Sequence, residues 1–129
     1  MVARGDRLLV IRRSQHVRAP GMYCFPGGGI EPGETEDVAV SREMQEELAA
    51  TVEPVRLLWR YVTSWGVDLA WWLVKLPDDA PLVHNPLEVE AFHWMHPREI
   101  RALDQLLESN LHFLDAVEAG EIVVDGLEL

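Results

Sequence analysis

Residues 28–50 read GGIEPGETEDVAVSREMQEELAA, a glycine-rich loop that leads into a strongly acidic segment. The overlapping stretch 25–34 holds four glycines and two prolines, so it forms neither a helix nor a central strand. Thr35 can cap the helix that follows, which we expect to run from residue 36 to about residue 50. A glycine-rich turn at the start of a helix brings backbone groups close to a ligand, so this stretch predicts a binding site.

The predicted helix places carboxylates beside its apolar stripe. At about 100° per residue, Val40, Met44 and Leu48 form the stripe that faces the core. Glu43 and Glu47 lie next to this stripe, four residues apart, where two like charges cost roughly 0.2–0.5 kcal/mol. A solvated acidic face would interleave lysines, and this helix has none. The crowded carboxylates therefore indicate a hard divalent cation, Mg²⁺ or Mn²⁺, which takes oxygen ligands.

Arg42 is the only basic residue in the predicted helix. Helical spacing predicts that it points away from most of the glutamates. A calcium-binding EF-hand does not fit, because an EF-hand places alternating acids in a loop and these acids lie on a helix.

The rest of the chain reads as short strands and helices. Runs rich in Val, Leu, Trp and Tyr predict strands, and amphipathic spacing predicts two further helices. The expected strands are 7–13, 22–25, 52–64, 67–76 and 88–95. The first of the two helices begins at Pro97 and carries Ile100, Leu103 and Leu107, and the second is capped by Asn110 and stops at Gly120. This order predicts one α+β domain over residues 1–129, with a mixed or antiparallel sheet flanked by helices.

The composition limits the classes of partner. The chain has 129 residues, of which 48% are hydrophobic and 26% charged, so it can bury a core. Its formal net charge of −11 repels a long nucleic acid, and no apolar run is long enough for a membrane span. The single cysteine, Cys24, cannot form an internal disulfide, so we expect a reducing, cytoplasmic setting.

The spacing of the charged residues resembles the Nudix box, G-x5-E-x7-R-E-U-x-E-E-x-G-U, in which U is a bulky aliphatic residue. The matching positions are Gly28, Glu34, Arg42, Glu43, Met44, Glu46 and Glu47. The chain departs from the box at its last glycine and last aliphatic residue, which are Ala49 and Ala50. Positive φ costs alanine roughly 1 kcal/mol, so either Ala49 ends the helix at that cost or the helix runs on.

The resemblance to the Nudix hydrolase family implies a Nudix-like α/β/α sandwich and a set of site residues. Glu43 and Glu47 would be the principal metal ligands, with Glu46 sharing or bridging a second ion. The backbone carbonyl of Gly28 would be a further ligand. Arg42 would orient the glutamates by hydrogen bonding, and Glu34 would support the loop through that arginine.

A further acid in this family often lies six residues before a tryptophan. Glu88 precedes Trp94 by that distance, so it is the candidate for a metal ligand or for the general base, and Glu90 is the alternative. The catalytic residues that the resemblance implies are therefore Glu46, Glu47, Glu88 and Arg42.

The reaction implied by the resemblance is Mg²⁺- or Mn²⁺-dependent hydrolysis of a diphosphate linkage. The substrate would be a small nucleoside diphosphate derivative or nucleoside triphosphate, attacked by water at phosphorus. Phe25, Tyr61 and Trp65 are candidates for stacking on its base. The alternative is a catalytically silent Nudix-fold module that binds a nucleotide as a sensor. The sequence leaves open which base the substrate carries, which group is linked to its diphosphate, and whether the chain forms a homodimer.

Overall fold

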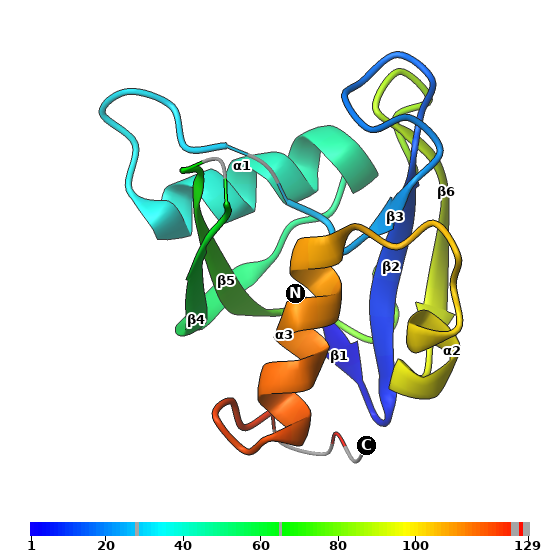
Figure 1. Cartoon of the computed structure of the whole chain (residues 1–129). Coiled ribbons are helices and arrows are strands. Elements are labelled where there is room, and N and C mark those ends of the chain that lie inside the picture. Colours follow the sequence, from blue (N-terminus) through cyan, green and yellow to red (C-terminus); the bar gives the residue numbers. More distant parts are fainter. Residues whose placement is uncertain (28, 65, 125–126, 128–129) are drawn as a thin grey trace.

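The computed structural model describes residues 1–27, 29–64, 66–124 and 127, and Figure 1 shows the arrangement of its helices and strands. The strands are β1 (Ala3–Arg4), β2 (Arg7–Arg13), β3 (Tyr23–Cys24), β4 (Glu53–Val62), β5 (Asp68–Lys75) and β6 (Val89–Met95). The helices are α1 (Glu36–Leu48), α2 (Pro97–Arg101) and α3 (Glu108–Glu118). None of the helices in this described part of the chain combines the length and the hydropathy that a membrane span needs.

Strand β2 organises the larger sheet. It pairs antiparallel with β1, β3 and β6, and its residues 8–11 are completely buried. The β4–β5 hairpin forms a second, two-stranded antiparallel sheet. Backbone hydrogen bonds between Val74 and Met1 and between Met1 and Trp72 tie this hairpin to the start of the chain. The pairing among described strands is antiparallel, with one isolated parallel bridge between Tyr23 and Leu106.

The two faces of β2 bury two different clusters. Because side chains alternate along a strand, Leu8 and Val10 pack with Phe113 of α3, while Leu9 and Ile11 pack with the α1 side chains. The helices α1 and α3 thus cover opposite faces of the same strand. This arrangement matches the expected α+β sandwich.

Helix α1 ends one residue before the departure from the box. Ala49 has φ 51° and ψ 33°, the left-handed conformation, and its N–H donates to the carbonyl of Gln45. The alternative in which the helix runs on through Ala50 is therefore wrong. The carbonyls of Leu48 and Glu47 accept from the backbone N–H groups of Val83 and Asn85, so the segment before β6 is anchored to the end of α1.

The two C-terminal helices differ from the expected pattern. Helix α2 stops at Arg101, so Leu103 and Leu107 lie outside it. Helix α3 begins earlier than expected, with Leu107 as its N-cap, and Asn110 is buried inside its first turn. The prediction of Asn110 as a cap is wrong because its side-chain oxygen accepts a hydrogen bond from the N–H of Phe25, far away in sequence.

Candidate active site

Glu47 is the most deeply buried of the acids on α1, with 6% of its surface exposed. Its Oε1 accepts a hydrogen bond of 2.8 Å from the N–H of Gly27, which attaches the glycine-rich loop to the helix. Burial raises the pKa of Glu47 to about 8, and the charges of Glu43 and Glu88 add to this rise. The Gly27 hydrogen bond and the positive charge of Arg13 oppose it without cancelling it. The side chain is therefore a carboxylate held in a place that disfavours its negative charge.

Glu88 reaches the same place from another element. It lies immediately before β6, and its Oε2 is buried and has no hydrogen-bond partner among the described residues. Burial raises the pKa of Glu43, and the negative charges of Glu46 and Glu88 raise it further. The carboxyl groups of Glu43, Glu47 and Glu88 thus repel one another at one site. A buried polar atom without a partner costs roughly 1–3 kcal/mol, so this oxygen needs a ligand.

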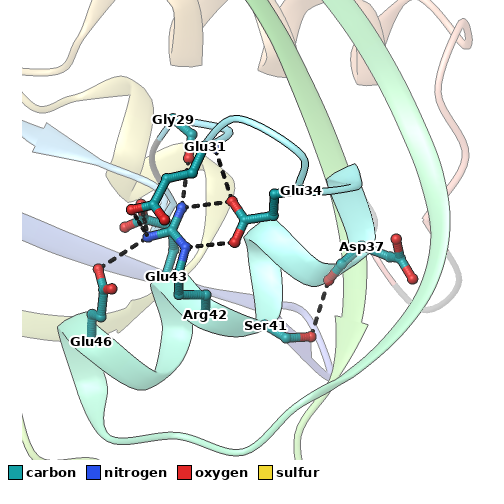
Figure 2. Close-up of polar contacts among 8 residues, drawn as sticks. All are labelled: Gly29, Glu31, Glu34, Asp37, Ser41, Arg42, Glu43 and Glu46. Carbon is teal, nitrogen blue, oxygen red and sulfur yellow. Dashed lines mark hydrogen bonds and ion pairs between the residues drawn. The ribbon is translucent and has the colours of Figure 1, made fainter.

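Arg42 neutralises part of the negative charge of Glu34, Glu43 and Glu46. Figure 2 shows its guanidinium enclosed by carboxylates: Nε donates to Glu34 at 2.7 Å, and Nη1 donates to Glu43 at 3.0 Å and to Glu46 at 3.2 Å. Nη2 donates to the carbonyl of Gly29 at 2.8 Å and to the second oxygen of Glu34. The prediction that Arg42 points away from most of the glutamates is wrong, because its long side chain bends around the helix. The contacts expected between Arg42, Glu34 and the box glutamates are present.

The carboxylate oxygens of the acidic group are the type of ligand that a hard divalent cation prefers, but they are not arranged around one point. Across the described ranges, no three His, Cys, Asp or Glu side chains are already placed as a ligand set for one ion. Arg42 holds Glu43 and Glu46, which accounts for part of this arrangement. The unpartnered oxygen of Glu88 and the buried carboxylate of Glu47 are the donors that Mg²⁺ or Mn²⁺ prefers.

The remaining predicted site residues do not all lie within the described part of the chain. Gly28 and Trp65 lie outside the described residues. Glu90, the alternative to Glu88, is exposed and forms an ion pair with Arg12 at 3.6 Å, so it does not join the acidic group. Residues two apart in a regular strand share a face, so alternation alone would keep Glu88 and Glu90 together. The register shift between Arg12 and Arg13, whose partners are Ala91 and Val89, leaves Glu90 as an extra residue in β6 and explains the separation.

The predicted stacking residues take different positions. The ring of Phe25 is buried and packs edge-on against Phe113, so its ring belongs to the core. Tyr61 is half-buried; its ring stacks on that of Trp59 and is tilted against that of His112, with 5.2 Å between ring centroids in each pair. Trp71, the neighbour of Trp72 on β5, is buried and stacks on Phe113. Tyr61 is thus the described candidate that stays accessible.

Arg13 was not among the predicted site residues. It ends β2 on the same face as Leu9 and Ile11, the face covered by α1. Its positive charge lowers the pKa of Glu47 against the larger effect of burial. Because side chains alternate along a strand, residue 13 faces the same side as residues 9 and 11, and this spacing could have identified Arg13 as a site residue.

Comparison with known proteins places the chain in a family. A model of the NUDIX domain matches residues 1–117. An NAD-capped RNA hydrolase of Stutzerimonas stutzeri is 32% identical over 80% of this chain and 37% of its own length. An uncharacterized Nudix hydrolase of Rhodococcus erythropolis is 31% identical over 76% of this chain and 60% of its own.

These relatives are longer than the matched region, since the chain spans between about a third and two thirds of their length. A solved NUDIX hydrolase from Nitrosomonas europaea superimposes with a TM-score of 0.77 at 19% identity, covering 93% of this chain and 69% of that one. At this identity the likeness concerns the fold. The NUDIX domain match covers nine tenths of the chain, and it shows that the chain belongs to the Nudix hydrolase family.

Proposed function

We propose that the chain is a divalent-metal-dependent hydrolase of a diphosphate linkage in a nucleoside diphosphate derivative or nucleoside triphosphate, with water attacking at phosphorus. One observation carries the proposal: the buried, unpartnered oxygen of Glu88 lies with Glu43 and Glu47 in a group of carboxylates that repel one another. Such a group is stable in a fold when a cation completes it.

The acids divide into two groups by their surroundings. Glu47 and Glu88 are the inner pair and, within the described residues, form no ion pair with Arg42. Glu43 is the third ligand, with Glu46 at the exposed rim. When bound, Mg²⁺ or Mn²⁺ supplies charge neutralisation of the diphosphate oxygens and a more acidic water. The carbonyl of Gly28 stays a predicted ligand.

The protein's own groups have separate tasks in this proposal. Arg42 positions Glu43 and Glu46 and has no donor nitrogen without a protein acceptor, so it does not bind substrate. A carboxylate takes the proton of the attacking water, and the candidates are Glu46, Glu47 and Glu88. Glu88 is preferred, because its free oxygen is available to accept a proton or a metal.

We infer the substrate class from the family and from the activities after which its relatives are named. Tyr61 stays the predicted stacking residue for a base, a contact worth roughly 1–3 kcal/mol in other proteins. The relatives include an 8-oxo-dGTP diphosphatase of Escherichia coli and an RNA pyrophosphohydrolase of Erythrobacter litoralis. Small nucleotides are the preferred substrates here because of the net charge of −11, and capped RNA belongs in the test.

The test is phosphate and nucleotide release from a panel of nucleoside triphosphates, dinucleotides, nucleoside diphosphate derivatives and NAD-capped RNA. Each reaction is run with Mg²⁺, with Mn²⁺ and with a chelator. Metal-dependent cleavage of a diphosphate linkage is expected. Nucleotide binding without cleavage of any substrate would instead identify the silent sensor module. The cytoplasmic setting and a homodimer stay predictions.

A further inference from the structure

Arg13 is held at the active site by the geometry of β2. Odd-numbered residues of this strand face α1, and Leu9 and Ile11 pack there against Met44. Arg13 continues this row to the edge of the core, where it reaches Cys24. Its neighbour Arg12 faces the other side of the sheet. The strand thus presents one arginine to the acidic group and one away from it.

The contacts of the two arginines differ in kind. Arg12 lies over the ring of Tyr23, 5.4 Å from its centroid, and pairs with Glu90. Arg13 donates from Nε to the carbonyl of Arg18 at 2.7 Å, and its Nη1 lies 3.9 Å from the Sγ of Cys24. Within the described part of the chain it forms no ion pair with a carboxylate, although the protein has 22 acidic residues against 11 basic ones.

The backbone around Arg13 is fixed to the segment that carries Glu88. Arg13 is paired with Val89 in the sheet. Ser14 donates from its N–H to the carbonyl of Glu88 and from its hydroxyl to the carbonyl of Leu87 at 2.8 Å. The guanidinium and the unpartnered carboxylate therefore start from two backbone positions that are locked together. Such preorganisation limits the entropy lost when a ligand is bound.

The electrostatic position of Arg13 calls for an anion other than a side chain. The guanidinium is near enough to lower the pKa of both Glu47 and Cys24, although burial dominates both pKa values and raises them. Arg42, the other cation of the site, already donates from all three nitrogens to protein oxygens. Arg13 is left with donor N–H groups beside the proposed metal site.

We propose that Arg13 is a substrate-binding residue whose guanidinium donates to a phosphate oxygen of the diphosphate. This inference rests on the proposed function, because it takes the diphosphate to lie against the acids Glu43, Glu47 and Glu88. Planar guanidinium groups bind phosphate oxygens through charge-assisted hydrogen bonds, which are stronger than neutral ones. Arg13 would also offset the negative field of the acidic chain where the anionic substrate enters.

The kinetic experiment compares Arg13→Gln with Arg12→Gln, a matched control one residue away on the opposite face. We expect kcat/KM to fall roughly 10- to 100-fold in R13Q, with a raised KM, and to stay within about threefold of wild type in R12Q. Arg13→Lys should recover part of the loss, since it restores charge without the planar fork. Equal losses in R12Q and R13Q, or no loss in R13Q, would overturn the assignment.

The binding experiment does not depend on turnover or on the identity of the nucleoside. Calorimetry measures the affinity for methylenediphosphonate, a diphosphate analogue that is not hydrolysed, with Mg²⁺ present. R13Q should weaken this affinity by about the factor seen in kcat/KM, and Mn²⁺ binding without the analogue should not weaken. A purely structural role would lower the melting temperature and leave the affinity of the folded protein unchanged.

The two experiments separate the possible failures. If the wild type binds methylenediphosphonate but cleaves no substrate, the proposed function fails and the comparison of R13Q with wild type still decides the role of Arg13. If the wild type cleaves diphosphates and R13Q binds the analogue as tightly as wild type does, the role of Arg13 fails alone. If the wild type does not bind the analogue with Mg²⁺, the inference fails with the proposed site.

Discussion

Replacing Glu47 by Gln should stabilise the metal-free protein. The ordinary pKa of a glutamate is 4.5, and the folded protein raises that of Glu47 to about 8, first by burial and next by the charge of Glu43. A folded pKa above the unfolded one means that the folded state holds the proton more tightly. The contribution of protonated Glu47 to the free energy of unfolding is therefore fully present below pH 4.5 and is lost as the pH rises to 8. Glutamine has nearly the same shape, keeps an oxygen for the N–H of Gly27, and carries no charge.

The magnitude follows from the distance between the pH and the unfolded pKa. Each pH unit within this window is worth about 1.4 kcal/mol, so at pH 7 the gain of Glu47→Gln approaches roughly 3 kcal/mol. At pH 4.5 the same substitution should change the free energy of unfolding by roughly 0.5 kcal/mol or less, because both side chains are then largely neutral in the folded protein. In melting temperature, the gain at pH 7 corresponds to roughly 10 °C.

Urea unfolding in the presence of EDTA, at constant ionic strength and at several pH values between 4.5 and 8, measures this difference. Glu46→Gln is the control: its side chain is 46% exposed and paired with Arg42, so its effect should be small. The same E47Q protein should lose most Mg²⁺-dependent hydrolysis. A destabilised E47Q, or a gain that does not grow with pH, would refute the burial argument.

Three further outcomes are expected. Mg²⁺ or Mn²⁺ at a hundredfold excess over Kd should raise the free energy of unfolding by about 2.7 kcal/mol, an effect that Glu43→Gln removes; equal melting curves with and without chelator, at matched ionic strength, would contradict it. Burial raises the pKa of the Cys24 thiol to about 11, so a thiol reagent at pH 8 should react only after unfolding, and Cys24→Ser should turn over within a few-fold of wild type. Ala49→Gly should add about 1 kcal/mol of stability in urea unfolding, because φ is 51° there, whereas Ala50→Gly at the buried neighbouring position should not.

The sequence predicted the elements that depend on local pattern. The glycine-rich loop, the acidic helix and strand β2 are where their residues placed them, since apolar spacing and turn residues decide such features over short distances. The family resemblance, not a local pattern, supplied the candidate acid before β6, Glu88, whose Oε2 is buried and has no partner among the described residues. Prediction was poorer where a side chain has a distant partner. Asn110 was read as a cap because asparagine favours caps, yet its partner Phe25 lies 85 residues away.

The contacts of Arg42 and Arg13 also could not be predicted from local sequence pattern. A helical wheel gives the direction of the Cα–Cβ bond, and Arg42 has enough rotatable bonds to return to Glu34 and Glu43 from the far side. The sequence placed Arg13 only in the expected strand 7–13, because its distance from Glu47 is set by how α1 packs on β2. Each arginine acquired its role from tertiary packing, which no local pattern contains.

The division of the charges explains how an acidic fold can hold a phosphate site. Arg42 neutralises Glu34, Glu43 and Glu46, whose side chains are 10%, 14% and 46% exposed, and fixes their geometry. The inner carboxylates of Glu47 and Glu88 have no such partner among the described residues, and in this place a second arginine would compete with a metal ion. Arg13 forms no ion pair with Glu47 among the described residues, but its charge opposes the raised pKa of that carboxyl. In the proposed site, a cation at that position would attract an incoming phosphate without occupying the carboxylates proposed as metal ligands, so metal and phosphate would bind together.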